Sequence, residues 1–209
     1  EVRQTLDVRT LTNDPTVGGQ GLRGLAFNAD ETRLYVTVPA RDLFHRQSGA
    51  AGYLAVIDTD LSKEDTPILR RDSDEDNLIR VGPAPYAITA TDDPDVMAFT
   101  DRAADTKGVG ILRWTTVRTL VAGEIVETRT YDLNYIDLSR FGVNRTWSEG
   151  RDTQVLGVSN AQGIVFLSSE VVESFTRTDD DPADKVYPSY IFITSYNRFV
   201  EEDPKKDPN

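Results

Sequence analysis

The sequence contains no cysteine and a single histidine, His45, among its 209 residues. Without cysteine there are no disulfides, thiolate nucleophiles, iron–sulfur clusters or zinc sites with cysteine ligands. With one histidine, a metal site of several imidazoles is excluded, and Ser-His-Asp catalysis would have to run through His45. These two absences remove several common classes of catalytic and metal site before any motif is considered.

Long apolar runs and an excess of positive charge are also missing. No stretch of about 20 apolar residues is present, so we expect no membrane-spanning segment. The 23 basic side chains stand against 35 acidic ones, which gives a net charge of −12 and a pI near 4.5. Nucleic acids and anionic membranes bind basic surfaces, so neither is an expected partner. The balance of 38% hydrophobic and 28% charged residues is that of a globular protein.

Helical periodicity is weak throughout, and strand patterns take its place. No segment shows a convincing 3.6-residue apolar period over three turns. Short runs rich in Val, Ile, Leu, Thr, Tyr and Phe recur instead, bounded by Gly, Pro and Asp, which is typical of β-strands. The sequence therefore predicts an all-β fold.

The strand-like runs repeat in a fixed order. They lie at 24–27, 33–37 and 52–57, then at 85–89, 96–100 and 109–114, and finally at 163–167 and 190–194. Fourth strands are expected at 78–81 and 127–131, and residues 1–12 are expected to hold the outer strand of a preceding unit. Leu25 to Leu34 and Ala87 to Val96 are the same distance apart, which supports aligning the first two copies on Leu25 and Ala87. In the third copy an insertion, 170–188, replaces the short turn and is predicted to be a solvated surface excursion.

Two segments resemble a known repeat family. The segment 24–37, GLAFNADETRLYVT, followed by LAVIDT at 54–59, is similar to a blade of the YVTN-type, lactonase-like β-propellers. The segment 79–88, IRVGPAPYAI, is similar to that family's junction between consecutive blades. The resemblance covers about residues 20–115 and, in part, 160–199.

The resemblance implies an incomplete β-propeller of about two and a half four-stranded antiparallel blades. Blade 1 would span about 22–82 and blade 2 about 84–135, and blade 3 would begin at about 153. Propellers close with about four to eight blades. We therefore expect the chain to be part of a larger propeller, completed by remaining blades of the same polypeptide or by other chains.

The family does not by itself select an activity, because its members include surface and adhesion modules, dehydrogenase subunits and sugar-lactone hydrolases. We expect a non-catalytic module of a larger extracellular or cell-surface protein, which acts as a scaffold or contacts a protein or a glycan. The alternatives are a segment of a propeller enzyme, of the lactone hydrolase or dehydrogenase subunit kind, and a structural component of a large assembly. No residue is assigned a catalytic role.

A threonine followed by an arginine recurs where the second strand of each copy ends. The pairs are Thr37 with Arg41, Thr100 with Arg102, and Thr194 with Arg198. An arginine at one repeated position is suited to bidentate binding of a carboxylate or phosphate. The alternative, which we favour, is an ion pair with a neighbouring aspartate such as Asp42, Asp101 or Asp105.

The other candidate ligand-binding residues are aromatic or are the single histidine: Phe44, His45, Trp147 and Tyr196. Aromatic faces on loops bind sugars and peptides. The alternative for His45 is a partly buried polar residue without a ligand. Trp114, at the end of an apolar strand, is predicted to lie in the core.

Two acidic clusters are weak candidates for binding calcium, which is the one cofactor that the sequence suggests. Their aspartates are Asp58 and Asp60 in the first cluster and Asp72, Asp74 and Asp76 in the second. Oxygen ligands at alternate positions are typical of calcium loops, but Leu69 and Pro83 stand where an EF-hand has its glutamate. The alternative for the first cluster is turn chemistry after a strand.

Overall fold

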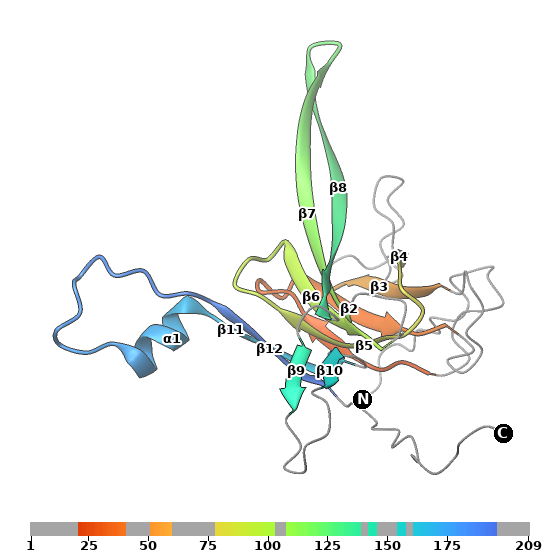
Figure 1. Cartoon of the computed structure of the whole chain (residues 1–209). Coiled ribbons are helices and arrows are strands. Elements are labelled where there is room, and N and C mark those ends of the chain that lie inside the picture. Colours follow the sequence, from red (N-terminus) through yellow and green to blue (C-terminus); the bar gives the residue numbers. More distant parts are fainter. Residues whose placement is uncertain are drawn as a thin grey trace, which may run out of the picture.

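The part of the chain that the computed structural model describes consists of antiparallel β-sheets with one short helix (Figure 1), so the all-β expectation is confirmed. The structure describes residues 21–40, 51–59, 78–102, 108–138, 142–145, 154–157 and 161–195. Within these ranges there are two four-stranded sheets and two two-stranded sheets, and hydrophobic cores join the two four-stranded sheets to each other and one of the two-stranded sheets to the second of them.

The first sheet contains β1 (Leu25–Phe27), β2 (Arg33–Val38), β3 (Gly52–Asp58) and β4 (Leu78–Val81), paired in chain order. Polar side chains stabilise the turn that joins β1 to β2. The Asn28 side chain accepts a hydrogen bond from the Arg33 amide over 2.9 Å, and Asp30 accepts one from the Thr32 amide over 3.2 Å. Asn and Asp close turns in this way because their short side chains reach nearby backbone amides.

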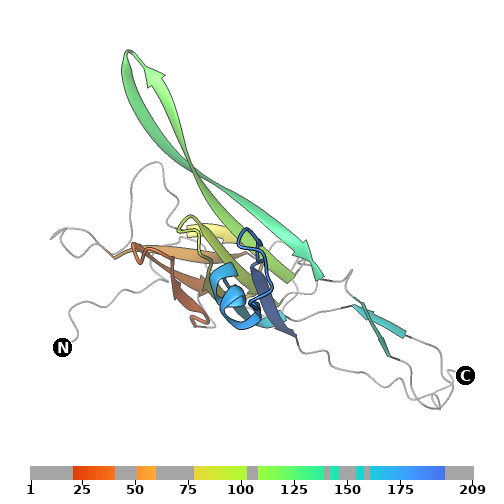
Figure 2. The same cartoon turned by 90° about the vertical axis from the view of Figure 1, so that its left-hand side faces the viewer.

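The second sheet contains β5 (Pro85–Ala90), β6 (Val96–Asp101), β7 (Gly108–Val121) and β8 (Glu124–Asp137), also in chain order. β6 pairs with β7 only from Val109 to Arg113, whereas β7 and β8 pair along their full length. The distal part of this hairpin, residues 115–130, therefore projects away from the sheet (Figures 1 and 2); we call it the arm. Ala122 and Gly123 both have positive φ angles at its end, as a two-residue type I′ turn requires.

The third sheet contains β11 (Ala161–Leu167) and β12 (Tyr190–Ser195), and a separate pair is formed by β9 (Gly142–Arg145) and β10 (Gln154–Gly157). The connection from β11 to β12 begins with helix α1 (Ser169–Thr176). The Ser168 hydroxyl caps this helix by accepting a hydrogen bond from the Val171 amide over 3.4 Å. The sequence did not predict α1, because eight residues are too few to show a helical period over three turns.

The three sheets share two hydrophobic cores. Between the first and second sheets lie Tyr35, Leu54, Val56, Ile79, Val81, Ile88, Met97, Phe99, Leu112 and Trp114. Between the second and third sheets lie Ala98, Val109, Leu138, Ala161 and Ile164. Trp114 is buried in the first of these cores, as predicted, although β7 continues beyond it to Val121.

The sheets follow one another through their first strands. β1 and β2 lie against β5, and in the same way β5 and β6 lie against β11. The first strands β1, β5 and β11 are consequently neighbours in that order, and the sheets succeed each other in space as they do in the chain (Figure 2).

Candidate functional site

Most of the candidate residues named from the sequence lie outside the described residues. They are Arg41, Phe44, His45, Trp147, Tyr196 and Arg198, together with the calcium candidates Asp60, Asp72, Asp74 and Asp76. Arg102 and Asp58 lie within the described residues, so the structure reports on these two.

Arg102 lies against the first strand of its own sheet. Its guanidinium carbon is 4.6 Å from the centre of the Tyr86 ring, a cation–π contact. Its backbone amide donates to the Ala84 carbonyl over 2.9 Å. The neighbouring Asp101 is buried and accepts a hydrogen bond from the Ala84 amide over 3.2 Å. Arg102 and Asp101 thus both hold the N-terminal end of β5 in place, so the contacts of Arg102 are structural.

Asp58 is the last residue of β3 and is buried. It stands opposite Arg33 in the β2–β3 ladder, and directly opposed residues of an antiparallel pair project from the same face. Among the described residues, no group of three or more His, Cys, Asp or Glu side chains could hold a metal ion.

The threonine makes a repeated contact at the end of each second strand. The Thr37 hydroxyl oxygen accepts a hydrogen bond from the Gly24 amide over 2.5 Å and donates to the Tyr86 carbonyl of the next sheet over 2.9 Å. Thr100 repeats this arrangement: it accepts from the Ala87 amide over 3.1 Å and donates to the Gln162 carbonyl over 3.1 Å. Neither threonine is exposed to solvent.

Thr194 occupies the same position in the third sheet. Its hydroxyl oxygen accepts a hydrogen bond from the Gly163 amide over 2.8 Å, as Thr37 and Thr100 do from Gly24 and Ala87. No acceptor for the Thr194 hydroxyl is present among the described residues. The hydrogen bonds show that Gly24, Ala87 and Gly163 are equivalent, which aligns Leu25 with Ile88 and not with Ala87 as the sequence suggested.

A polar cluster forms a second link between the first two sheets. The Trp114 indole nitrogen donates to the Tyr35 hydroxyl over 2.7 Å, and burial raises the pKa of Tyr35. The guanidinium carbons of Arg33 and Arg129 lie 5.7 Å and 5.3 Å from the centre of the Trp114 ring. Both arginines also contact the carboxylate of Asp95, Arg33 over 3.8 Å and Arg129 in a short ion pair. The polar side chains between these sheets therefore bind one another.

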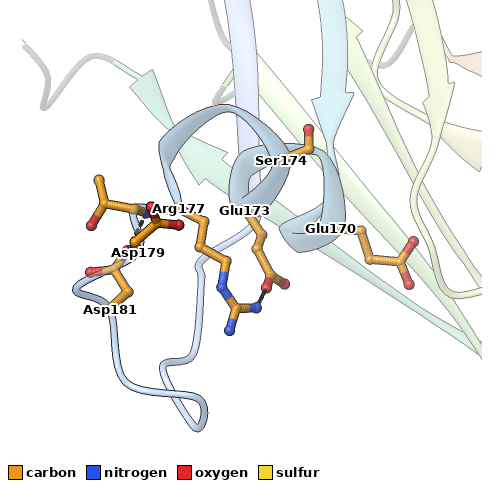
Figure 3. A pocket seen from close by; sticks show the side chains of 7 residues that line it. Glu170, Glu173, Ser174, Arg177, Asp179 and Asp181 are labelled. Atoms are coloured by element: carbon orange, nitrogen blue, oxygen red, sulfur yellow. Dashed lines mark hydrogen bonds and ion pairs between the residues drawn. The ribbon is translucent and has the colours of Figure 1, made fainter.

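A hollow beside α1 is lined by Glu170, Glu173, Ser174, Arg177, Thr178, Asp179 and Asp181 (Figure 3). Glu173 forms an ion pair with Arg177 one helical turn later. Asp181 accepts hydrogen bonds from Lys185 over 2.8 Å, from the Tyr187 hydroxyl over 2.8 Å and from the Thr178 amide over 3.0 Å. The Lys185 hydrogen bond, with those from Thr178 and Tyr187, holds the pKa of Asp181 below its usual range. Two of the four carboxylates that line this hollow are thus already bound to neighbouring side chains.

The end of the arm carries exposed apolar side chains on both of its faces, and we call this end the tip. Leu120 and Ile125 stand opposite each other in the β7–β8 ladder and are 71% and 70% exposed. Val117, Val121 and Val126 are exposed on the opposite face of the hairpin, since side chains alternate between the two faces along each strand. The sequence pattern does not predict the tip, because its apolar run for the third strand ends at Trp114. The sequence signal that was present is the pair of segments rich in Thr, Val and Ile, 115–121 and 124–130, on either side of the Ala122–Gly123 turn.

No helix in the part of the chain that the structure describes is long and apolar enough to cross a membrane. Comparison of the chain with protein-family models, with curated proteins and with solved structures found no match.

Proposed function

We propose that this chain is an arc of a β-propeller that serves as a non-catalytic interaction module, and that it contacts another protein through the tip of the arm. The module would belong to a larger extracellular or cell-surface protein. The observation that carries the proposal is the exposed pair Leu120 and Ile125 at the end of a hairpin that leaves the sheet stack.

The stacking of the sheets supports the propeller arrangement. A propeller consists of four-stranded antiparallel sheets arranged radially around a channel. Here the first two sheets have four antiparallel strands in chain order, and the first strands of all three sheets are neighbours. Thr37 and Thr100 join each sheet to the next by the same pair of hydrogen bonds. A contact repeated in this way is what a radial array of similar units requires.

The chemistry of the tip favours a protein partner over a glycan. Glycans are bound by aromatic faces together with polar groups, whereas the tip consists of leucine, isoleucine and valine side chains. Folded proteins seldom expose contiguous apolar patches without a use for them. Aliphatic side chains on a projecting hairpin fit an apolar depression on another protein.

The polar groups between the sheets support a structural role for this part of the molecule. Thr37 and Thr100 are buried and bound to backbone groups, and Asp95 is bound by two arginines. The enzyme alternative is tested by native mass spectrometry of the intact protein. We expect the mass of the polypeptide alone, and a stoichiometric calcium ion or quinone would favour the enzyme.

The proposed contact is tested by placing a photoreactive amino acid at position 120 and exposing the chain to the surface of its source cells. We expect one discrete crosslinked protein, and we expect Ile125→Asp to abolish that product. A probe at Thr115, at the base of the arm, is the matched control and should give no such product. A variant in which Asn-Gly replaces residues 117–128 should keep the circular dichroism spectrum and lose the partner. Equal crosslinking from positions 115 and 120, or crosslinking that survives Ile125→Asp, would contradict the proposal.

A further inference from the structure

The arm has an open edge on the side where β6 ends. β6 pairs with β7 up to Arg113, and the Trp114 amide then donates to the Asp95 carbonyl over 2.8 Å in the turn before β6. Beyond Trp114, no strand among the described residues pairs with this side of β7. Residues 115–127 are all exposed, and the arm stands clear of the sheets (Figures 1 and 2). The position beside the distal part of β7 therefore has room for another strand.

The main-chain groups of Arg118 and Leu120 point out of this edge. Residues that face each other in an antiparallel pair alternate between bonded and non-bonded pairs. Val121 closes the two-residue turn and belongs to a bonded pair, so Leu120 and Arg118 belong to non-bonded ones. The Trp114 amide, which donates to Asp95 on the β6 side, gives the same alternation. Arg118 and Leu120 each direct one N–H and one C=O outward, at the spacing that an extended strand requires.

This edge has few of the features by which edge strands usually avoid pairing. Prolines, bulges and charged side chains protect such edges, but residues 115–121 contain no proline and the β7–β8 ladder runs without a register shift. The one charged side chain in this segment, Arg118, forms an ion pair over 2.7 Å with Glu127 of the same hairpin. The facing segment of β8, 124–130, contains three charged residues. The β7 edge is thus the less protected edge of the arm.

The apolar side chains of the tip say what kind of strand would fit. Leu120 and Ile125 lie on one face of the hairpin, and Val117, Val121 and Val126 lie on the other. A strand added to the edge alternates its own side chains between the same two faces, so both of its faces have apolar neighbours. A two-stranded hairpin is only marginally stable in water, and a third strand stabilises it. The fitting strand therefore carries apolar side chains at consecutive positions.

We propose that the partner protein binds the arm by adding an extended apolar strand to the edge of β7, alongside residues 117–121. Main-chain groups of that strand would bond those of Arg118 and Leu120, and its side chains would cover the apolar residues on both faces of the tip. This inference rests on the partner contact of the proposed function and specifies how that contact is made.

A further sheet of the array and a second copy both fit this edge less well. The sheets of this chain pack face to face through their hydrophobic cores, so further sheets of the same array would cover faces and leave this edge open. If a second copy presented its own β7 edge, the register that engages Arg118 and Leu120 of both copies would set each Arg118 opposite a Leu120. Each copy also carries a net charge of −12, which opposes their association.

Proline at position 118 tests the strand addition, with the crosslink from a photoreactive residue at position 120 as the measurement. The Arg118 N–H takes no part in the β7–β8 ladder, so Arg118→Pro removes a donor from the open edge and keeps the bonds of the hairpin. We expect the crosslinked product to fall by about tenfold or more, since about tenfold is the usual effect of one lost hydrogen bond. Arg118→Ala keeps the N–H and should retain the product.

Glu127→Pro is the matched control. Glu127 stands opposite Arg118, and its N–H points out of the other edge of the arm. This proline therefore perturbs the hairpin to the same extent but leaves the β7 edge intact, and the crosslinked product should persist. Both proline variants should keep the circular dichroism spectrum of the unmodified chain.

Deuterium exchange shows directly which edge is used. The amides of residues 118 and 120 point out of one edge and those of residues 125 and 127 out of the other, so all of them should exchange fast in the free chain. In the purified crosslinked product, the amides of residues 118 and 120 should lose this fast exchange, whereas those of residues 125 and 127 should keep it.

Four results would overturn the inference. They are a product that survives Arg118→Pro, an equal loss with Glu127→Pro, an equal loss with Arg118→Ala, and a product that consists of two copies of this chain. A product that requires Ile125 but survives Arg118→Pro would overturn the strand addition alone and leave the partner contact in place. A probe at position 120 that gives no discrete product would overturn the partner contact, and the strand addition with it.

Discussion

The indole nitrogen of Trp114 donates a hydrogen bond to the hydroxyl of Tyr35 over 2.7 Å, and this bond joins two different sheets. Trp114 belongs to β7 and Tyr35 to β2, and both side chains are buried in the core that the first two sheets share. The ring of Tyr131 packs edge-on against Trp114 at 5.3 Å between centres. A polar bond inside an apolar core fixes how the sheets sit on each other, because its geometry is directional whereas burial alone is not.

Tyr35→Phe tests this bond. The substitution keeps the ring and removes the acceptor, so the buried indole N–H of Trp114 loses its partner. The expected loss in the free energy of unfolding is about 1–3 kcal/mol, measured by urea denaturation. Tyr190→Phe, at an exposed position, is the matched control and should change the stability by less than about 0.5 kcal/mol. Equal effects of the two substitutions would show that the bond contributes nothing.

Thr100→Val tests the repeated contact between sheets. Valine has the shape of threonine but leaves the Ala87 amide and the Gln162 carbonyl without their bonds. We expect a loss of about 1–3 kcal/mol and faster deuterium exchange at the Ala87 amide. Thr100→Ser should recover most of the stability, because it restores the hydroxyl. The control is Thr119→Val on the exposed arm. If Thr100→Val is as harmless as the control, the sheets are not joined through this hydroxyl.

The sequence located the strands of the sheet stack, but not the residues that join the sheets. Strand positions depend on local preference and on flanking turn residues, which the sequence contains. The partner of Thr37 is a carbonyl 49 residues away and that of Thr100 is one 62 residues away. No local pattern specifies such a pairing, so the recurrence was attributed to the arginines, of which only Arg102 is described.

The sequence also left open how the first strands of the copies align with one another. Spacing alone could not decide whether Leu25 corresponds to Ala87 or to Ile88, since either choice gives two apolar strands. Side chains alternate between the two faces of a strand. A shift of the alignment by one residue therefore assigns every side chain that faces the preceding sheet to the face toward the next sheet. The Gly24 and Ala87 amides, bound to Thr37 and Thr100, settle the choice for Ile88. With this register, the exposed residues Leu25 and Phe192 are equivalent to Ile88 and Tyr35, which are buried.

Gly24→Ala tests how closely β1 approaches β5. A Cβ atom at position 24 would lie 2.5 Å from the Tyr86 carbonyl oxygen and 3.0 Å from the Ala87 Cα atom. Both are backbone atoms, so relief requires the two first strands to separate. We expect a loss of about 1–3 kcal/mol in the free energy of unfolding, measured by urea denaturation. Thr115→Ala on the exposed part of β7 is the control. A stable Gly24→Ala variant would show that β1 and β5 are farther apart than this structure places them.

Two buried tyrosines should ionise only at a higher pH than tyrosines in an unfolded chain. Burial raises the pKa of Tyr35 and of Tyr135, and the Tyr135 hydroxyl also accepts a hydrogen bond from the Gly82 amide over 3.0 Å. In the unfolded chain both phenols ionise near pH 10. The folded protein holds these two protons to higher pH. The stabilisation from the two phenols is therefore complete below about pH 10 and is lost as the pH rises through the folded pKa values.

Absorbance near 295 nm measures this behaviour, because it reports phenolate formation at the eight tyrosines. We expect Tyr35 and Tyr135 to belong to a group of phenols that ionises only as the fold is lost. Tyr35→Phe and Tyr135→Phe should each remove one phenol from this late group. If Tyr35→Phe instead reduces the phenolate that forms while the fold is still intact, the Tyr35 hydroxyl is open to water. In that case the bond to Trp114 does not lie in a sealed core, and the first two sheets are not packed as the structure shows.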